Sequence, residues 1–266
     1  MDYKRIGVDG SALSPFLEIY RTRVLPEIGR RWRPAVIICP GGAYGTLSDR
    51  EAGYVALRYQ AFGVQAFVLR YSVGNKRYPI ALLELATAVK YLRTNALSYD
   101  IDPARIFLCG FSAGGHLAAN LGTVWDSPLL AGCFDDPDLI RPSGLILCYP
   151  VITAGDGAHE ESMRHLLGRN PGRQEREAVS LERHVSPKTP PSFLWHTADD
   201  QMVSVRDSIL FAEALAKNGV PFEMHIFPQG GHGLSLADDF TAAAENHINE
   251  RCSQWFALSL KWLEAL

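Results

Sequence analysis

Residues 105–122, RIFLCGFSAGGHLAANLG, carry the clearest structural signal in this chain. It begins with an apolar run typical of a buried strand and ends with small and apolar residues spaced as in a helix. Between them, Gly110–Gly114 reads GFSAG, a G-x-S-x-G pattern in the strand–turn–helix setting that it requires. Such a turn lifts the hydroxyl of Ser112 out at the carboxyl end of a sheet, facing the helix N-terminus. We predict Ser112 as a nucleophile; the alternative is a glycine-rich turn with an incidental serine.

Similar apolar runs recur along the chain and predict further strands. Their near-continuous apolar character is typical of parallel strands that are covered on both faces. Phe16–Arg21 instead alternates polar and apolar residues, which predicts an antiparallel edge strand near the N-terminus. The apolar runs cover residues 35–39, 64–71, 105–109, 144–149, 192–196 and 222–227.

Helical spacing fills intervals between these strands. Apolar residues recur every three or four positions from Leu82 to Leu92 and again from Val205 to Ala216. The second of these helices is expected to end near Gly219, which favours a left-handed cap. A long C-terminal helix is expected over residues 238–263. The alternation predicts an α/β fold, a mostly parallel doubly wound sheet with helices on both faces, in one domain over residues 1–266.

One segment, residues 153–191, interrupts the alternation. It lacks a strand pattern, is rich in charge, contains two short helical patterns and ends with three prolines. We call it the excursion. It is either a solvated surface segment or a lid-like wall of a pocket, because long insertions in compact domains are often functional. Its three histidines, His159, His165 and His184, are expected to face solvent.

Composition excludes several classes of protein. The 266 residues carry 26 Lys+Arg against 29 Asp+Glu, a formal net charge of −3 without a basic run, which argues against nucleic-acid binding. No window approaches about 18 unbroken apolar residues, so no membrane span is expected. The N-terminus lacks the basic-then-apolar pattern of a signal peptide. We therefore expect a cytoplasmic protein.

The five cysteines are far apart, and none forms a C-x-x-C pair. Their odd number and spacing predict free thiols in a reducing compartment and no metal site. They are Cys39, Cys109, Cys133, Cys148 and Cys252.

Two further loops carry residues that could serve Ser112. HTADD, residues 196–200, follows a predicted strand and ends in two carboxylates, of which we choose Asp200 over Asp199 because it lies further into the loop. His232 lies between glycines in QGGHGLSL, residues 229–236, after the last predicted strand. The chain order of nucleophile, acid and histidine is that of an α/β-hydrolase, and all three residues follow strands. His232 would take the serine proton, and Asp200 would orient the imidazole.

Ester or amide hydrolysis through a serine also needs donors for the oxyanion. The loop CPGGAYG, residues 39–45, follows a predicted strand, and its small residues leave the N–H groups of Gly42 and Ala43 free to point at the site. The N–H of Ala113, directly after the nucleophile, would supply another donor. Tyr44 is a candidate wall for the substrate.

Several motifs together resemble the acetyl-esterase/lipase-like group of α/β-hydrolases, and most closely bacterial carbohydrate or xylan-oligosaccharide acetyl esterases. The motifs are PGGAYG, LSDREAG, VLRYSV, GFSAGGHLA, HTADD and GGHGLSL. The resemblance extends from Phe16 to Leu263 and implies an eight-stranded sheet, a Ser112–Asp200–His232 triad and hydrolysis of small esters without a cofactor. The related motif His-Gly-Gly-Gly reads Pro40 to Ala43 here, so the usual histidine support of that loop is missing.

The first hypothesis is therefore a serine esterase that removes acetyl or other short acyl groups from a small carbohydrate or similar alcohol. A serine peptidase or aminopeptidase of the prolyl-oligopeptidase type uses the same machinery and is the alternative. A third reading is a catalytically inactive binding protein on a hydrolase fold. The expected partner is a small-molecule ester, with no nucleic acid and no membrane; homo-oligomer formation is left open.

Overall fold

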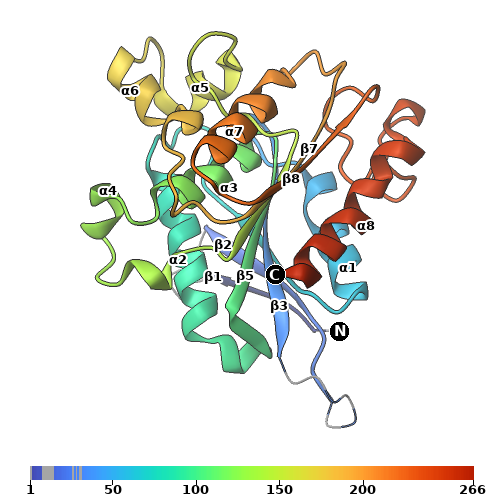
Figure 1. Cartoon of the computed structure of the whole chain (residues 1–266). Helices are drawn as coiled ribbons and strands as arrows, with labels where there is room; N and C mark the ends of the chain where they lie inside the picture. Colours follow the sequence, from blue (N-terminus) through green and yellow to red (C-terminus); the bar gives the residue numbers. More distant parts are fainter. Residues whose placement is uncertain (1, 8–14, 26, 28, 30–31) are drawn as a thin grey trace.

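The computed structural model describes residues 2–7, 15–25, 27, 29 and 32–266. The strands of this part of the chain form one eight-stranded sheet in the order β1-β2-β4-β3-β5-β6-β7-β8 (Figure 1). From β4 to β8 neighbouring strands are parallel, whereas the β1–β2 and β2–β4 pairs are antiparallel. The strands are β1 (Asp2–Gly7), β2 (Phe16–Arg21), β3 (Arg33–Cys39), β4 (Gln65–Arg70), β5 (Ile101–Phe111), β6 (Gly144–Cys148), β7 (Ser192–Thr197) and β8 (Phe222–Phe227).

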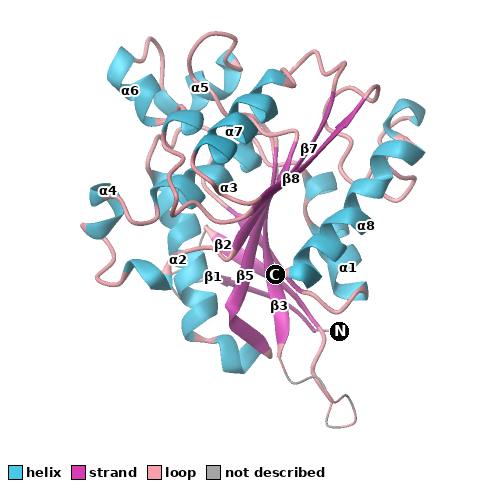
Figure 2. Ribbon diagram, viewed as in Figure 1, coloured by secondary structure: helices cyan, strands magenta, loops and turns pink. Residues whose placement is uncertain are grey.

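Helices cover both faces of this sheet, which confirms the predicted α/β fold (Figure 2). The α-helices are α1 (Gly53–Ala61), α2 (Ile80–Thr94), α3 (Ala113–Val124), α4 (Pro128–Ala131), α5 (Glu160–Leu167), α6 (Arg173–Ala178), α7 (Arg206–Lys217) and α8 (Glu250–Ala265). Short 3₁₀ helices are η1 (Asp49–Glu51), η2 (Ala96–Tyr99), η3 (Pro137–Leu139), η4 (Leu181–Arg183) and η5 (Glu245–His247).

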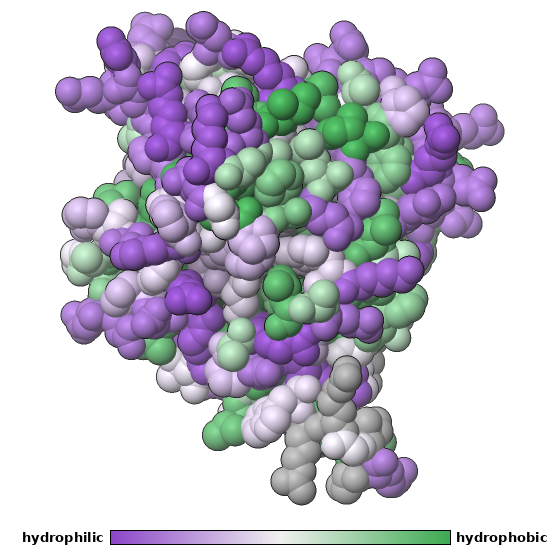
Figure 3. Space-filling view, viewed as in Figure 1, coloured by the Kyte–Doolittle hydropathy of each residue, from purple (hydrophilic) through white to green (hydrophobic). Residues whose placement is uncertain are grey.

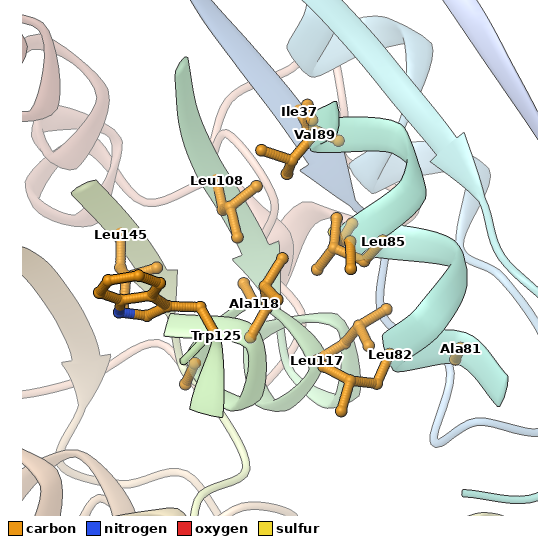
Figure 4. Packing of buried hydrophobic residues seen from close by; sticks show 14 of the residues in the cluster. Ile37, Ala81, Leu82, Leu85, Val89, Leu108, Leu117, Ala118, Trp125 and Leu145 are labelled. Carbon is orange, nitrogen blue, oxygen red and sulfur yellow. The ribbon is translucent and has the colours of Figure 1, made fainter. Parts of the chain in front are cut away.

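The sheet separates two hydrophobic clusters. One joins α2, α3 and α7 to the sheet face that carries Ile37 and Leu108, and the other joins α1 and α8 to the opposite face. Figure 4 shows the first cluster, where Val89 of α2 lies beside Ile37 of β3 and Leu85 lies further along the same helix. Burial on both faces explains why the central strands have apolar residues at consecutive positions. This packing holds β5 and α3, and with them the turn at Ser112.

Two predictions about element position are wrong. Phe16–Arg21 does form an antiparallel strand, but β1 pairs outside it, so β2 is not the edge. The C-terminal helix begins at Glu250 rather than at residue 238, since Asn249 accepts a hydrogen bond from the Cys252 N–H at 3.1 Å and caps it. Residues 238–249 form turns and η5 instead.

The excursion contains no strand, as predicted, and its two helical patterns become α5 and α6. Hydrophilic residues gather over these helices in Figure 3. Its inner side chains are buried, however, and Met163, Leu166 and Val179 join the cluster with α2 and α3. The excursion is therefore packed onto the body of the molecule. Within the described residues, no helix is long and apolar enough to cross a membrane.

Candidate active site

Ser112 occupies a strained turn between β5 and α3. Its φ of 52° and ψ of −118° lie in a region that residues with a side chain rarely adopt. The Ser112 N–H donates to the Cys148 carbonyl at 3.0 Å, which ties the turn to the end of β6. Glycine is required on both sides, because a Cβ at Gly110 would collide with the Gly114 carbonyl and one at Gly114 with the Cys39 carbonyl. The neighbouring backbone thus fixes the position of the serine hydroxyl.

The three side chains that the sequence predicts as a triad lie in one hydrogen-bonded chain. Ser112 Oγ lies 2.9 Å from His232 Nε2, and His232 Nδ1 lies 2.6 Å from Asp200 Oδ2. They come from the loops after β5, β7 and β8, which are brought together at the carboxyl ends of parallel strands. Asp200 also accepts the N–H groups of Met202 and Val203 at 2.9 and 3.0 Å, which hold its carboxylate in place.

Hydrogen bonds stabilise the ionised form of Asp200. Burial alone would raise the pKa of this carboxyl, but hydrogen bonds from His196 and His232 outweigh burial and hold it well below its ordinary value. Asp199, the neighbour that the sequence left as the alternative, instead accepts the Gly231 N–H at 3.0 Å. The imidazole of His232 is therefore bonded to Asp200, and Asp199 braces the backbone just before it.

His196 is a residue near the site that the sequence analysis did not identify. It is fully buried in β7, and its Nε2 lies 3.2 Å from Asp200 Oδ2 and 3.0 Å from the Val203 carbonyl. A carbonyl only accepts, so Nε2 carries the proton and donates to this pair of oxygens. Asp200 Oδ2 thus contacts two histidines. The only signal in the sequence was the four-residue spacing between His196 and Asp200.

The loop after β3 holds the candidate oxyanion donors. Among the described residues, no hydrogen-bond acceptor is recorded for the N–H groups of Gly42, Ala43 and Ala113. Gly42 has a φ of 128° and Ala43 a φ of 53°, so the alanine adopts a left-handed conformation. Such a conformation costs an L-residue about 1 kcal/mol. The substitution of glycine by alanine in this motif is thus accommodated at a moderate cost.

A histidine supports this loop after all, but it comes from the excursion. His165 Nδ1 lies 2.9 Å from the Ala43 carbonyl and must donate to it. A Cβ added at Gly45 would lie 2.8 Å from the His165 ring, so glycine is needed for this approach. The three excursion histidines were expected to face solvent, and this expectation is wrong. All are half-buried, and His159 and His184 bond Ser162 and the Glu177 carbonyl at 2.8 Å.

Tyr44 was a candidate wall for the substrate, and its burial argues against this role. The residue is 3% exposed, and its hydroxyl lies 2.8 Å from His116 Nδ1. His116 Nε2 donates to the Val179 carbonyl at 2.9 Å, so Nδ1 is free to accept from the tyrosine. Burial lowers the pKa of His116 to about 4, which keeps this ring neutral. Tyr44 therefore ties the oxyanion loop to α3 through His116.

The sheet order, the strained serine turn and the hydrogen-bonded Ser–His–Asp chain define an α/β-hydrolase. Comparison with known proteins agrees with this class and also identifies the family. Residues 17–215 match the BD-FAE family model, and the chain belongs to this family.

Similar proteins, among them one of known structure, support this assignment to the α/β-hydrolases. The crystal structure of an acetyl ester-xyloside bifunctional hydrolase from Caldicellulosiruptor lactoaceticus is 39% identical, with a TM-score of 0.86, and the match covers 98% of this chain and 96% of that one. An endo-1,4-beta-xylanase B from Butyrivibrio fibrisolvens is 38% identical over 78% of this chain. An acetylxylan esterase from Xylanibacter ruminicola is 29% identical over 77% of this chain. The matches cover only 33% and 42% of the length of these two curated relatives.

Proposed function

We propose that the protein is a serine carboxylic-ester hydrolase that removes acetyl or other short acyl groups from small carbohydrate esters. One observation carries the serine-hydrolase part of this proposal: the continuous hydrogen-bonded chain from Ser112 Oγ through His232 to Asp200, with separations of 2.9 and 2.6 Å. A serine hydroxyl is a poor nucleophile at neutral pH unless a neighbouring base takes its proton. His232 Nε2 lies within reach of that proton.

The reaction would proceed through an acyl-enzyme. Ser112 Oγ attacks the ester carbonyl carbon while its proton passes to His232 Nε2, and Asp200 stabilises the resulting imidazolium. When the tetrahedral intermediate collapses, the C–O bond of the ester breaks, and His232 returns the proton to the departing alcohol. A water molecule then attacks the acyl carbon by the same proton route and releases the carboxylic acid. The ionised state of Asp200, which the pKa shift favours, suits it for this role.

The negative charge of the tetrahedral intermediate needs donors that are already oriented. The N–H groups of Gly42, Ala43 and Ala113 fit this requirement, since no hydrogen bond within the described chain occupies them. The N-terminus of α3 adds its positive dipole end at the same place. These groups also suit amide hydrolysis, so the choice of an ester rests on the relatives.

The proposed acyl and alcohol groups follow from the names of similar proteins. One is called an acetylxylan esterase and another an acetyl ester-xyloside bifunctional hydrolase. The nucleophile is buried, with Ser112 only 6% exposed, which is in keeping with a short acyl group. The excursion, which carries charged and polar side chains around α5 and α6, contacts the oxyanion loop through His165 and would form part of the wall of the site.

The test is hydrolysis of p-nitrophenyl esters from acetyl to octanoyl, and of acetylated xylo-oligosaccharides, by the wild type and Ser112→Ala. We expect the highest rate on acetyl and a loss of at least about 10⁴-fold in the variant. A preference for octanoyl would contradict the short-acyl proposal, and activity that survives Ser112→Ala would contradict the triad. Faster cleavage of aminoacyl p-nitroanilides would favour a peptidase. Failure of a fluorophosphonate to label Ser112 would favour an inactive binding protein.

A further inference from the structure

Glu51 is a buried carboxylate that the proposed mechanism does not use. It lies in the LSDREAG segment, residues 47–53, at the end of η1, and is 4% exposed. Its Oε2 accepts the Gly41 N–H at 2.8 Å, and its Oε1 accepts the Tyr149 hydroxyl at 2.7 Å. Neither donor carries a charge. Burying a carboxylate that has only two neutral donors costs desolvation free energy, so stability alone does not explain its presence.

The first of these bonds fixes the base of the oxyanion loop. Gly41 directly precedes Gly42, one of the proposed oxyanion donors, and packs against the nucleophile. A Cβ placed on Gly41 would lie 2.7 Å from Glu51 Oε2 and 3.1 Å from the Cβ of Ser112. The Glu51 carboxylate, Gly41 and Ser112 are therefore in close contact, and a shift of the carboxylate would move the loop relative to the serine.

The second bond reaches the histidine side of the site through Tyr149. The Tyr149 hydroxyl accepts the Ser235 N–H at 2.9 Å, three residues after His232. Its ring meets the His232 ring edge to face, with 5.0 Å between ring centres. Tyr149 itself has a φ of 38°, a strained conformation that its surroundings must hold in place. Ser235 is further tied to the same segment, because its hydroxyl donates to the Arg50 carbonyl at 2.7 Å.

We propose that Glu51 is a positioning residue that sets the oxyanion loop and the His232 loop at a fixed distance from each other. It does so through one carboxylate, with Gly41 on one oxygen and Tyr149 on the other. The inference rests on the proposed function. Since transition-state donors must be placed to within a fraction of an ångström, a change at Glu51 lowers the rate of the chemical step more than it weakens ground-state binding.

The test uses two variants of Glu51 that disturb the bridge, meaning its paired hydrogen bonds to Gly41 and Tyr149, in different ways. Glu51→Gln keeps the shape but presents an N–H₂ group to one of the two partners, so either the Gly41 N–H or the Tyr149 hydroxyl proton loses its acceptor. Glu51→Asp keeps the charge but is too short by one methylene to reach both partners. We expect both to lower kcat on p-nitrophenyl acetate by about 10- to 100-fold with KM changed less than about threefold. The rate of fluorophosphonate labelling of Ser112 should fall in parallel.

Two further variants separate positioning from simple loss of stability. Val89→Ala, in the packing between α2 and the sheet, should lower Tm while kcat stays near the wild-type value. Tyr149→Phe removes the other end of the bridge, so adding it to Glu51→Gln should cost much less than the product of the two single losses. Wild-type kcat in Glu51→Gln and Glu51→Asp, or fully multiplicative losses in the double variant, would overturn the inference.

The proposed function has its own, separate outcome. If the wild type hydrolyses esters and Ser112→Ala does not, the proposed function stands whatever the Glu51 variants do. If the wild type is inactive on every ester, the labelling rates of the wild type and the Glu51 variants still test the position of the loop. Equal labelling rates in all of them would overturn the role of Glu51.

Discussion

The loops of the candidate site and the excursion meet at the oxyanion loop, yet they are built differently. The site loops are held from several sides and keep strained residues in place, among them Ser112 and Tyr149. The excursion carries exposed charged helices, and few hydrogen bonds join it to the site, such as the bond between His165 and the Ala43 carbonyl. Chemistry depends on positions fixed within a fraction of an ångström, whereas a wall of a binding site tolerates variation. The contrast predicts that substitutions in the loops and in the excursion will have effects of very different size.

The largest effect on kcat is expected at the adjacent carboxylates Asp199 and Asp200. Asp200→Asn should lower kcat by about 10⁴-fold, because an amide can no longer fix the tautomer of His232. Asp199→Asn, a matched control one residue away, should lose less than about tenfold, since Asp199 braces backbone N–H groups near His232, chiefly that of Gly231. Steady-state kinetics on p-nitrophenyl acetate measures both. Equal losses in the two variants would contradict the assignment of Asp200.

An intermediate effect is expected at the junction between the two regions. Asp207 of α7 accepts the Ile152 N–H at 2.7 Å, just before the excursion, and burial raises the pKa of Asp207 to about 7. The folded state therefore binds this proton more tightly than the unfolded state does. The stability that the protonated Asp207 contributes is complete below about pH 4 and is lost as the pH rises through 7.

Asp207→Asn stays neutral at every pH and keeps an oxygen to accept the Ile152 N–H. The difference in unfolding free energy, variant minus wild type, should therefore rise by about 2 kcal/mol between pH 4 and pH 8, about half of the limit that a three-unit shift sets. Urea unfolding at intervals of one pH unit measures this difference. A difference that is independent of pH would show that folding does not raise the pKa of Asp207.

The smallest effect is expected within the excursion. His165→Ala removes the donor to the Ala43 carbonyl and should lower kcat/KM on p-nitrophenyl acetate by about tenfold, the equivalent of one ordinary hydrogen bond. Arg164→Ala on the same helix is the control, because Arg164 is exposed and should leave the rate within about twofold. If His165→Ala matches its control, the excursion would be merely adjacent to the oxyanion loop and would not support it.

Most of the fold and the centre of the candidate site could be predicted from the sequence. The central strands gave clear signals because burial on both faces selects apolar residues at every position. The strand β1 was missed because its residues, Asp2–Gly7, are mixed in polarity and depend on pairing with β2. The start of α8 was placed too early, since the cap at Asn249 depends on a local hydrogen bond that helical spacing does not reveal.

Ser112, Asp200 and His232 were predictable because the turn, the chain order and the ends of strands follow from local pattern and from the geometry of parallel sheets. The supports of these residues were not predictable. His196, His165 and Glu51 act through contacts with residues distant in sequence or through the exact fold of a loop, as in the bond from His165 to Ala43, which spans 122 positions. A short sequence pattern records which residue types a turn requires. Only tertiary packing decides which side chain reaches a given carbonyl or N–H group, because that depends on how separate elements are placed in space.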